Sequence, residues 1–376
     1  MSDSHGADPV AVAKDLVAVD SVSRVSSAPV CDVVERFMER HGFEIERLTY
    51  RDDAGVRKDS VIGKKGSGAG GLAFYSHVDT VPGDGWSTDP HSPVVRDDRL
   101  IGLGSCDMKG PLAATLCATA ALRDDQLDRA VYVAATADEE ISGRGARQID
   151  QESALYNAEL PRCGVIAEPT RMVPVYAHKG GARVIVTAHG RAAHTSTGRG
   201  VSANLLMAPF LAELPGLAET FRTDESFWNR DFDPPTNGFN VVYTDFGTRP
   251  NVSAPKAVCT VSFRPAPGDR TQDVLDMVSE RARAHGLEVE AHAGTPFQVD
   301  PDSEVVRTAL AATGAEHART VPYGTDAHAF KQRVQLVVMG PGDIAQAHTD
   351  GEWIEVAQLR RAVDVYGRMV REVCQT

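Results

Sequence analysis

The sequence has no cluster of basic residues and carries an excess of acidic ones. Its 376 residues include 39 lysines and arginines against 52 aspartates and glutamates, which gives a formal net charge of −13. Because phosphate binding needs clustered Lys and Arg, we expect neither nucleic acid nor an anionic membrane as a partner. The sequence also lacks any apolar run near the ~18 residues of a membrane-spanning helix, and no internal repeat is found.

The six cysteines form no CxxC pair and are scattered along the chain. This spacing predicts free thiols in a reducing compartment rather than a disulfide framework. Residues 1–6 are polar and acidic, and they lack the basic start and apolar core of a secretory signal peptide. These absences together predict a cytoplasmic protein.

The sequence does contain the alternation of strands and helices that is typical of an α/β protein. Apolar residues recur at helical spacing over 8–22 and 28–41, and an Ala-rich helix is expected at 111–124. Short apolar runs, which predict strands, alternate with these helices. Such alternation favours a mixed, mainly parallel sheet with helices on both faces. The chain is long enough for two domains of roughly 100–200 residues each.

The pattern changes after Glu168 and predicts an inserted second domain. Strand, helix, strand, strand, helix and strand are expected in turn at 175–189, 202–221, 239–246, 257–264, 271–285 and 287–293. This βαββαβ order is that of a ferredoxin-like α+β unit. The α/β pattern resumes at Glu304. We therefore expect a first domain of residues 1–175 and 295–376, with a second domain at 176–294 inserted into it.

Adjacent carboxylates end one of the apolar runs. The small and apolar residues 131–137 are followed directly by Asp138, Glu139 and Glu140. A buried strand that ends in acids directs them to the carboxyl edge of its sheet, where open α/β sheets bind ligands. Neighbouring carboxylates repel each other, and a metal cation can hold both of them ionised. The run therefore predicts part of a metal site.

Four further segments also carry polar residues where a strand meets a loop. His77 and Asp79 follow one apolar run, Asp107 lies between glycines before a helix, Glu168 ends another run, and His348 lies in a loop after a strand. His77 and Asp79 are two residues apart, which suits a histidine ligand oriented by a carboxylate. Each position alone is more often a cap or a loop residue. Their common placement, with nitrogen and oxygen donors that suit zinc, predicts one metal site.

These segments, in this order, resemble a known family. They are Ser76–Pro82, Gly104–Gly110, Asp138–Glu140 with Gly143, Ala167–Thr170 and Ala347–Thr349. The set is similar to the di-zinc amidohydrolase family of acetylornithine deacetylase, succinyl-diaminopimelate desuccinylase, carboxypeptidase G and the aminoacylases. The resemblance implies a zinc aminopeptidase-like fold whose inserted domain acts as a lid and a dimer interface, so a homodimer is expected. It also implies a cis peptide bond between Asp107 and Met108.

The resemblance implies two Zn²⁺ ions per subunit, for which Co²⁺ can substitute. Asp107 would bridge the ions, with His77 and Glu168 completing one site and Glu140 and His348 the other. The ions would share a water or hydroxide, as in other two-metal sites. This assignment leaves Glu140 as the metal ligand of the acidic run.

The resemblance gives the remaining residues roles around the metals. Glu139 would be the general base, which later protonates the leaving amine, and Asp79 would orient His77. Neighbouring side chains on a strand diverge, which fits separate roles for Glu139 and Glu140. His194, in the inserted domain, would stabilise the oxyanion of the scissile carbonyl.

Four more positions match substrate-binding residues of the family. They are Asn251, Arg264, Gly324 and Thr325. Arg264 would bind the carboxylate of the substrate, because its guanidinium can bond both oxygens. The following Asp326, like Asp343, is a second-rank candidate for a cationic side chain, and a turn residue is the alternative.

The substrate is expected to be an N-acyl amino acid. The segments 323–327 and 340–349 look closest to acetylornithine deacetylase, so deacetylation of N-acetylornithine, in arginine biosynthesis, is the leading hypothesis. A succinyl-diaminopimelate desuccinylase, an N-acetyl-lysine-type deacylase and a dipeptidase or carboxypeptidase remain as alternatives. A non-catalytic binding protein is disfavoured, since such a relative would have lost Glu139 or a ligand.

Overall fold

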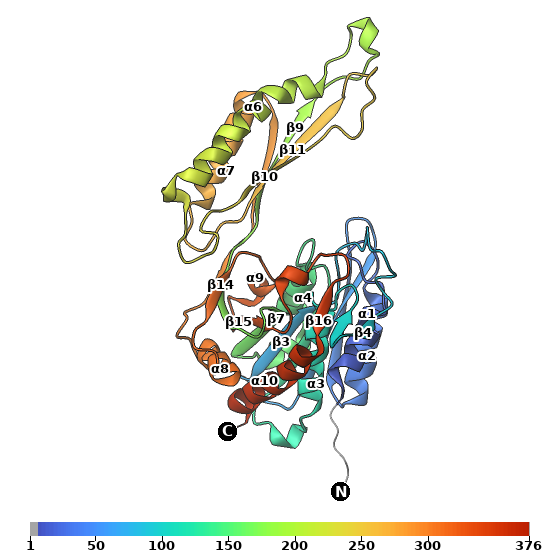
Figure 1. Cartoon of the computed structure of the whole chain (residues 1–376), viewed down its shortest axis with the longest axis vertical. Coiled ribbons are helices and arrows are strands. Elements are labelled where there is room, and N and C mark those ends of the chain that lie inside the picture. The colour runs from blue at the N-terminus through green and yellow to red at the C-terminus, as the bar shows by residue number, and fades with distance from the viewer. Residues whose placement is uncertain (1–6, 376) are drawn as a thin grey trace. The chain divides into compact units, whose positions relative to one another are not determined.

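The computed structural model describes residues 7–375. Residues 1–6, on which the expected lack of a signal peptide rests, lie outside this range. The chain forms two compact units (Figure 1). The first unit comprises Met1–Tyr176, Val299–Arg319 and Thr325–Thr376, and the second comprises Ala177–Gln298 and Thr320–Gly324.

The first unit is built on a mixed sheet. Its strands follow the order β1 (Glu44–Arg51), β2 (Arg57–Lys65), β6 (Val131–Thr136), β3 (Leu72–His77), β7 (Cys163–Pro169) and β15 (Gln335–Gly340). The last four are parallel to one another, whereas β1 and β2 are antiparallel to their neighbours. At β8 (Val175–His178) the chain passes to the second unit, and the short strands β13 (Phe297–Gln298) and β14 (Arg319–Val321) pair there. The expected mixed, mainly parallel sheet is confirmed.

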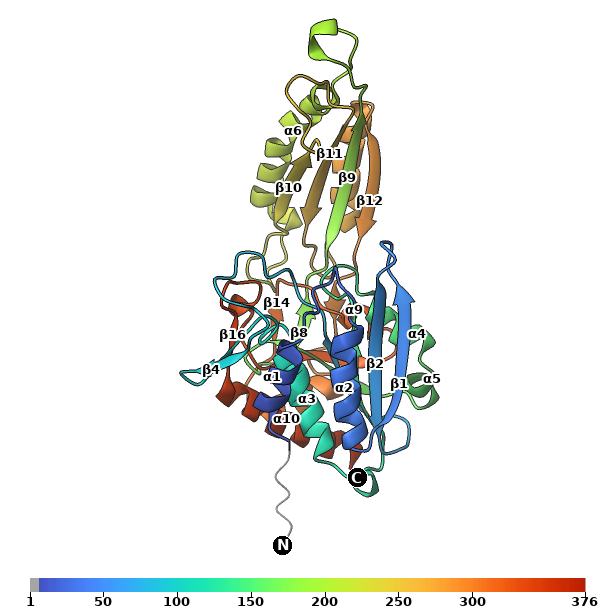
Figure 2. The ribbon, with the colours of Figure 1, turned by 90° about the vertical axis from the view of Figure 1, so that its right-hand side faces the viewer.

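Helices cover both faces of this sheet (Figure 2). One face carries α1 (Pro9–Val17), α2 (Ala28–Arg40), α3 (Lys109–Ala120) and α10 (Val356–Cys374), and the other carries α4 (Arg144–Glu152), α5 (Ala154–Ala158) and α9 (Ala327–Phe330). Helix α8 (Glu304–Thr313) shares the hydrophobic core of α3 and α10.

The central strands are buried on both faces. On β3, Leu72 and Phe74 join the larger hydrophobic core, while Tyr75 faces the other way and stacks on Phe330 of α9 with ring centroids 4.0 Å apart. Because successive side chains of a strand point to opposite faces, a strand covered on both sides reads as one continuous apolar run. This explains why the end of each such run marks the edge of the sheet.

A small antiparallel sheet lies beside the main one and was not predicted. It contains β4 (Val94–Arg96), β5 (Arg99–Ile101) and β16 (Trp353–Glu355). Strands of three residues are too short to show a periodic pattern. Within residues 7–375, no helix combines the length and apolar character needed to cross a membrane.

The second unit is a four-stranded antiparallel sheet with two helices. Its elements are β9 (Ala182–His189), α6 (Ala203–Thr223), β10 (Phe239–Thr244), β11 (Lys256–Phe263), α7 (Thr271–Ala284) and β12 (Glu288–Ala293). The strand order is β10-β11-β9-β12, as in a ferredoxin-like fold. Alternate residues of β9 are buried with apolar side chains of both helices in a separate hydrophobic core. The predicted βαββαβ order is therefore observed.

The expected single strand at 175–189 is wrong, because Lys179–Gly181 separates β8 from β9. At this break the backbone approaches another segment closely: the N–H of Gly294 donates to the carbonyl of Gly181 at 2.6 Å. A Cβ atom on Gly180 would lie 2.9 Å from the carbonyl oxygen of Gly294. The glycines that permit this contact carry no periodic signal, so the sequence pattern could not reveal the break.

Candidate active site

Three parallel strands end at one edge of the main sheet and place polar side chains there. His77 is the last residue of β3, Glu168 lies near the end of β7, and the Asp138–Glu140 turn follows β6. The loop after β15 carries His348, and Asp107 lies in the loop before α3. The carboxyl edge of a parallel sheet is the usual place for a ligand site.

The five residues expected to hold metal come together there. His77 Nε2 lies 3.0 Å from Asp107 Oδ1 and 3.8 Å from Glu168 Oε1. His348 Nε2 lies 3.4 Å from Asp107 Oδ2 and 3.2 Å from Glu140 Oε1. Asp107 thus presents one oxygen to each histidine, an arrangement that suits a carboxylate between two cations. Potential ligand atoms of His77, Asp107 and Glu140 all lie within 4.8 Å of one another.

The charges of this cluster fit bound cations. Among residues 7–375, no Lys or Arg forms an ion pair with Asp107, Glu140 or Glu168; only the histidines do. Hydrogen bonds to Asp107 and Glu140 raise the pKa of His348 to about 10. Burial lowers the pKa of His77, but the contact with Asp107 outweighs it and raises that pKa well above its usual value. Three carboxylates with two imidazoles therefore attract positive charge, as a divalent ion requires.

Asp79 makes contacts that differ from those expected. His77 Nδ1 lies 2.9 Å from the backbone carbonyl oxygen of Asp79 and 3.7 Å from its carboxylate Oδ1. The backbone carbonyl, rather than the carboxylate, is thus the closer partner of the ring. The carboxylate accepts hydrogen bonds from the N–H groups of Glu139 (3.1 Å) and Glu140 (3.2 Å), and from the hydroxyl of Ser23 (2.7 Å). It therefore holds the backbone of the acidic turn.

Glu139 is partly buried beside the cluster. Burial raises the pKa of its carboxyl well above the usual range. The negative charge of Asp326 adds to this increase, while His77 opposes it. A carboxyl group with a raised pKa next to a cation site is a candidate for proton transfer.

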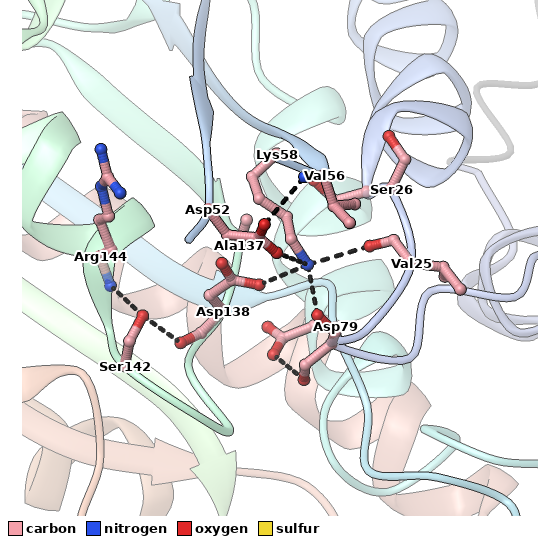
Figure 3. A network of polar contacts seen from close by, with 12 residues as sticks. Val25, Ser26, Asp52, Val56, Lys58, Asp79, Ala137, Asp138, Ser142 and Arg144 are labelled. Atoms are coloured by element: carbon pink, nitrogen blue, oxygen red, sulfur yellow. Dashed lines mark hydrogen bonds and ion pairs between the residues drawn. The ribbon is translucent and has the colours of Figure 1, made fainter. Parts of the chain in front are cut away.

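Lys58 is a buried charged residue that the sequence interpretation missed. It lies on β2, and its side chain reaches the turn after β6, where its Nζ forms a 3.0 Å ion pair with Asp138 Oδ1 (Figure 3). Nζ also donates to the backbone carbonyl oxygens of Val25, at 3.0 Å, and of Ser23. The hydroxyl of Tyr50 donates to the other oxygen of Asp138 at 2.7 Å.

Glu352 is a second buried residue that was missed. Its carboxylate accepts hydrogen bonds from the N–H groups of Gly104 (3.0 Å), Cys106 (2.7 Å) and Asp107 (2.9 Å). Burial raises the pKa of Glu352 to about 7, although these hydrogen bonds oppose the increase. Glu352 thus links the Asp107 loop to the segment that follows His348.

The peptide bond between Asp107 and Met108, in the same loop, is cis, as the resemblance implied.

Three of the other expected residues lie in the second unit and are exposed: His194, Asn251 and Arg264. His194 Nδ1 lies 2.7 Å from the hydroxyl of Ser196, and the N–H of Thr195 donates to the carbonyl of Asn251 at 3.0 Å. His194 and Asn251 are therefore on adjacent segments. Arg264 lies at the end of β11, where its guanidinium is near Gly181.

Gly324 and Thr325 stand where the chain passes from the second unit to the first. Thr325 is buried, and its hydroxyl accepts from the N–H of Ala327 at the start of α9. Asp326 is buried as well, with one carboxylate oxygen accepting from Thr136 at 2.9 Å. Asp326 is thus tied to the end of β6, just before the acidic turn. Asp343, by contrast, caps a turn through Ala345.

Known proteins are similar to this chain in sequence and in fold. An acetylornithine deacetylase of Myxococcus xanthus is 34% identical over 373 residues, covering 96% of each chain. The structure is similar to that of human carnosine dipeptidase 1, with a TM-score of 0.74 at 17% identity over 97% of this chain and 95% of the other. It is also similar to the YXEP protein of Bacillus subtilis, described as a dinuclear metal binding peptidase, with a TM-score of 0.61 at 17% identity over 97% of both chains.

The sequence pattern of one family matches most of the chain. That pattern, described as peptidase family M20/M25/M40, covers residues 73–372. The matched range includes the whole cluster at the sheet edge and the inserted second unit. Together with the near full-length identity to a curated relative, the match confirms the resemblance inferred from the sequence motifs. The chain belongs to the peptidase family M20/M25/M40 and is a hydrolase.

Proposed function

We propose that the protein hydrolyses the amide bond of an N-acyl amino acid with the help of divalent metal ions, and that N-acetylornithine is its substrate. The observation that carries the proposal is the arrangement of two imidazoles and three carboxylates around Asp107, with no lysine or arginine paired to those carboxylates among the described residues. The name of the Myxococcus xanthus relative supports acetylornithine as the substrate.

We propose two Zn²⁺ ions per subunit, for which Co²⁺ can substitute. Asp107 would bind both, His77 and Glu168 would complete one site, and Glu140 and His348 the other. The distances between these side chains and the dinuclear description of the Bacillus subtilis neighbour support this number. Bound divalent ions polarise a carbonyl and make water a nucleophile near neutral pH.

Glu139 is proposed as the general base. It would take a proton from the attacking water and then deliver it to the nitrogen of the departing amine. Its burial, which raises its pKa, keeps the carboxyl able to hold that proton between the two steps. Asp79 would keep Glu139 in place through the backbone of the turn, and His77 through its carbonyl.

We propose that the residues expected in the second unit contact the substrate. His194 would stabilise the oxyanion, and Arg264 would bind the α-carboxylate with both of its terminal nitrogens. Asn251, Gly324 and Thr325 would line the remainder of the binding site. The first domain, 1–175 with 295–376, would be catalytic, and the domain at 176–294 would be the lid.

A homodimer through the second unit is also proposed. β10 is an edge strand of its sheet, and Val241, Val242 and Tyr243 on it are exposed. Edge strands that stay monomeric usually carry charges or proline, which these three positions lack. A second copy could continue the sheet and cover the apolar side chains. Light scattering of the purified protein tests this, and a monomer at micromolar concentration would refute it.

The activity is tested by incubating zinc-loaded protein with N-acetylornithine, N-acetyl-lysine, N-succinyl-diaminopimelate and a dipeptide. We expect release of acetate from N-acetylornithine with the highest kcat/KM. A higher kcat/KM for the succinyl compound, the lysine derivative or the dipeptide would show that N-acetylornithine is not the preferred substrate. Amide hydrolysis as the reaction class would still be supported. No turnover of any of the four would refute the reaction class.

A further inference from the structure

Asp138 is the one member of the acidic turn without a role in the proposed reaction. Its carboxylate is 2% exposed and is engaged on both oxygens, by Lys58 at 3.0 Å and by the hydroxyl of Tyr50 at 2.7 Å. Its backbone has a φ of 60°, in the left-handed region, which aspartate tolerates better than most residues. The side chain of Asp138 therefore points into the interior of the domain, toward Lys58 and Tyr50, and takes no part in the roles proposed for Glu139 and Glu140.

Lys58 connects this carboxylate to a segment that lies far away in the sequence. Its side chain is 1% exposed, and Nζ donates to the carbonyls of Ser23 and Val25 in the loop before α2. The same loop returns to the acidic turn by a second route, since the Ser23 hydroxyl donates to the carboxylate of Asp79.

These contacts form a closed ring around the acidic turn. Asp79 accepts the N–H groups of Glu139 and Glu140, and Asp138 precedes them in the chain. The turn is thus held on one side by the Lys58–Asp138 ion pair and on the other by Asp79 (Figure 3). Ser23 joins the two sides, because its carbonyl accepts from Lys58 and its hydroxyl donates to Asp79.

Stability alone does not explain a buried ion pair at this place. Apolar side chains of similar size often stabilise a protein interior as well as a buried ion pair or better, because both charges lose their hydration. An ion pair differs in that it fixes the direction of the groups that carry it. The turn needs such direction, because Glu139 would face the substrate and the next residue, Glu140, would face a metal.

We propose that the Lys58–Asp138 ion pair is a positioning device that sets the turn so that Glu140 reaches the metal and Glu139 reaches the reacting atoms. The proposal rests on the proposed function. Neither residue of the pair is expected to touch substrate. The pair acts only through the backbone of the turn.

Three variants test the proposal: Lys58→Met, Asp138→Asn and the double substitution. Methionine is unbranched like lysine but lacks the terminal ammonium, and asparagine also tolerates the left-handed backbone of residue 138. The matched control is Lys64→Met, which removes a lysine on the same strand that pairs with Glu159 at 2.9 Å. Each protein is examined by thermal unfolding, by zinc affinity in competition with a chromophoric chelator, and by hydrogen exchange of the Glu139 and Glu140 amides.

We expect both single variants to unfold at lower temperature. Lys58→Met leaves the buried carboxylate of Asp138 without its cation, and Asp138→Asn leaves Lys58, among the described residues, with only the 3.7 Å ion pair to Asp52. The double variant should recover most of the unfolding temperature. Its kcat should nevertheless stay on the order of 10²-fold below that of the wild type with KM unchanged, as expected for a catalytic group displaced by about 1 Å. Its zinc affinity should fall by about tenfold, and the two amides should exchange faster. Lys64→Met should keep wild-type kcat and exchange.

A double variant with wild-type kcat, zinc affinity and amide exchange would show that the pair is merely structural and would overturn the proposal. If Lys58→Met fails to fold, Asp138→Asn decides by the same three measurements. If the wild type hydrolyses no N-acyl amino acid, the proposed function fails. Amide exchange and zinc affinity, which do not depend on the substrate, then still decide whether the pair positions the turn.

Discussion

Several residues expected in the site differ in exposure between the two units. In the first unit, His77, Asp79 and Glu168 are at most 4% exposed, although each is polar or charged. In the second unit, His194 and Arg264 are exposed, and Val242 on β10 is 58% exposed although it is apolar. These three residues of the first unit are thus buried, whereas His194, Arg264 and the apolar side chain of Val242 in the second unit face solvent.

The two units would therefore contribute to an active site in different ways. Buried carboxylates are costly unless they are bonded, so the first unit surrounds them with fixed backbone donors and histidines. Such a site is ordered before any ligand arrives. The exposed groups of the second unit have few partners within it, and we expect them to gain partners from substrate and from a second copy. Substitutions in the first unit should therefore affect the chemistry or the metal affinity, whereas substitutions in the second unit should leave the metal affinity unchanged.

The largest effect is expected for Glu139→Gln in the first unit. The amide cannot accept a proton, so kcat should fall by about 10²–10⁴-fold, while the zinc content stays at the wild-type value. Elemental analysis and steady-state kinetics measure the two quantities. Glu140→Gln is the control, and it should lose zinc as well as activity. Loss of both metals from Glu139→Gln would show that this residue is a ligand rather than the base.

A nearly equal loss is expected in the second unit from His194→Ala. Removal of one oxyanion donor typically lowers kcat by about 10²–10³-fold. Zinc affinity should not change, because the residues proposed to bind the metal belong to the first unit. His189→Ala, which removes an exposed histidine of β9 that contacts Glu288, should leave kcat unchanged. Equal effects of the two substitutions would remove His194 from the reaction.

A smaller effect is expected from Glu352→Gln. The neutral amide turns one donor toward a backbone that offers only N–H groups, so the Asp107 loop loses part of its support. Zinc affinity should fall by about 10–100-fold, as for other residues that orient ligands. Glu355→Gln, at the exposed end of β16, should have no effect on zinc affinity. An unchanged affinity in Glu352→Gln would mean that the loop keeps its shape without the charge.

The smallest effect on the metal site is expected from Val242→Lys in the second unit. A lysine on an exposed edge strand opposes pairing with another strand, so light scattering should show a monomer. Zinc affinity should remain that of the wild type. Glu290→Lys, on the opposite edge strand β12, changes charge without touching β10 and should leave the dimer intact. A Val242→Lys dimer would place the interface elsewhere.

Sequence reasoning could locate the residues at the ends of buried strands. Because β3, β6 and β7 are covered on both faces, each reads as an apolar run, and His77, Glu140 and Glu168 stand at or just beyond the ends of those runs. His348 lies in the loop after β15, so its position beyond a strand also marked it as a candidate, and the resemblance to a family then assigned it to one of the two metals.

The residues that support the proposed metal-binding side chains could not be predicted in this way. Lys58 stands among charged residues, in Arg57–Ser60, and reads as solvent-exposed. In the structure its ammonium group is buried and donates hydrogen bonds to the carbonyl oxygens of Val25, which is 33 residues away, and of Ser23. Glu352 likewise owes its role to an N–H group 245 residues away, at Asp107. Such long-range partners leave no local pattern.

The strands that lead into and out of the second unit lie next to each other. His178 pairs with Phe297, and Ala177 pairs with Gln298, in antiparallel register. Two neighbouring antiparallel strands can be joined by a tight turn. The segment between them therefore begins and ends at neighbouring strands, so its sheet and helices can change in sequence or length while the chain still enters and leaves at the same place.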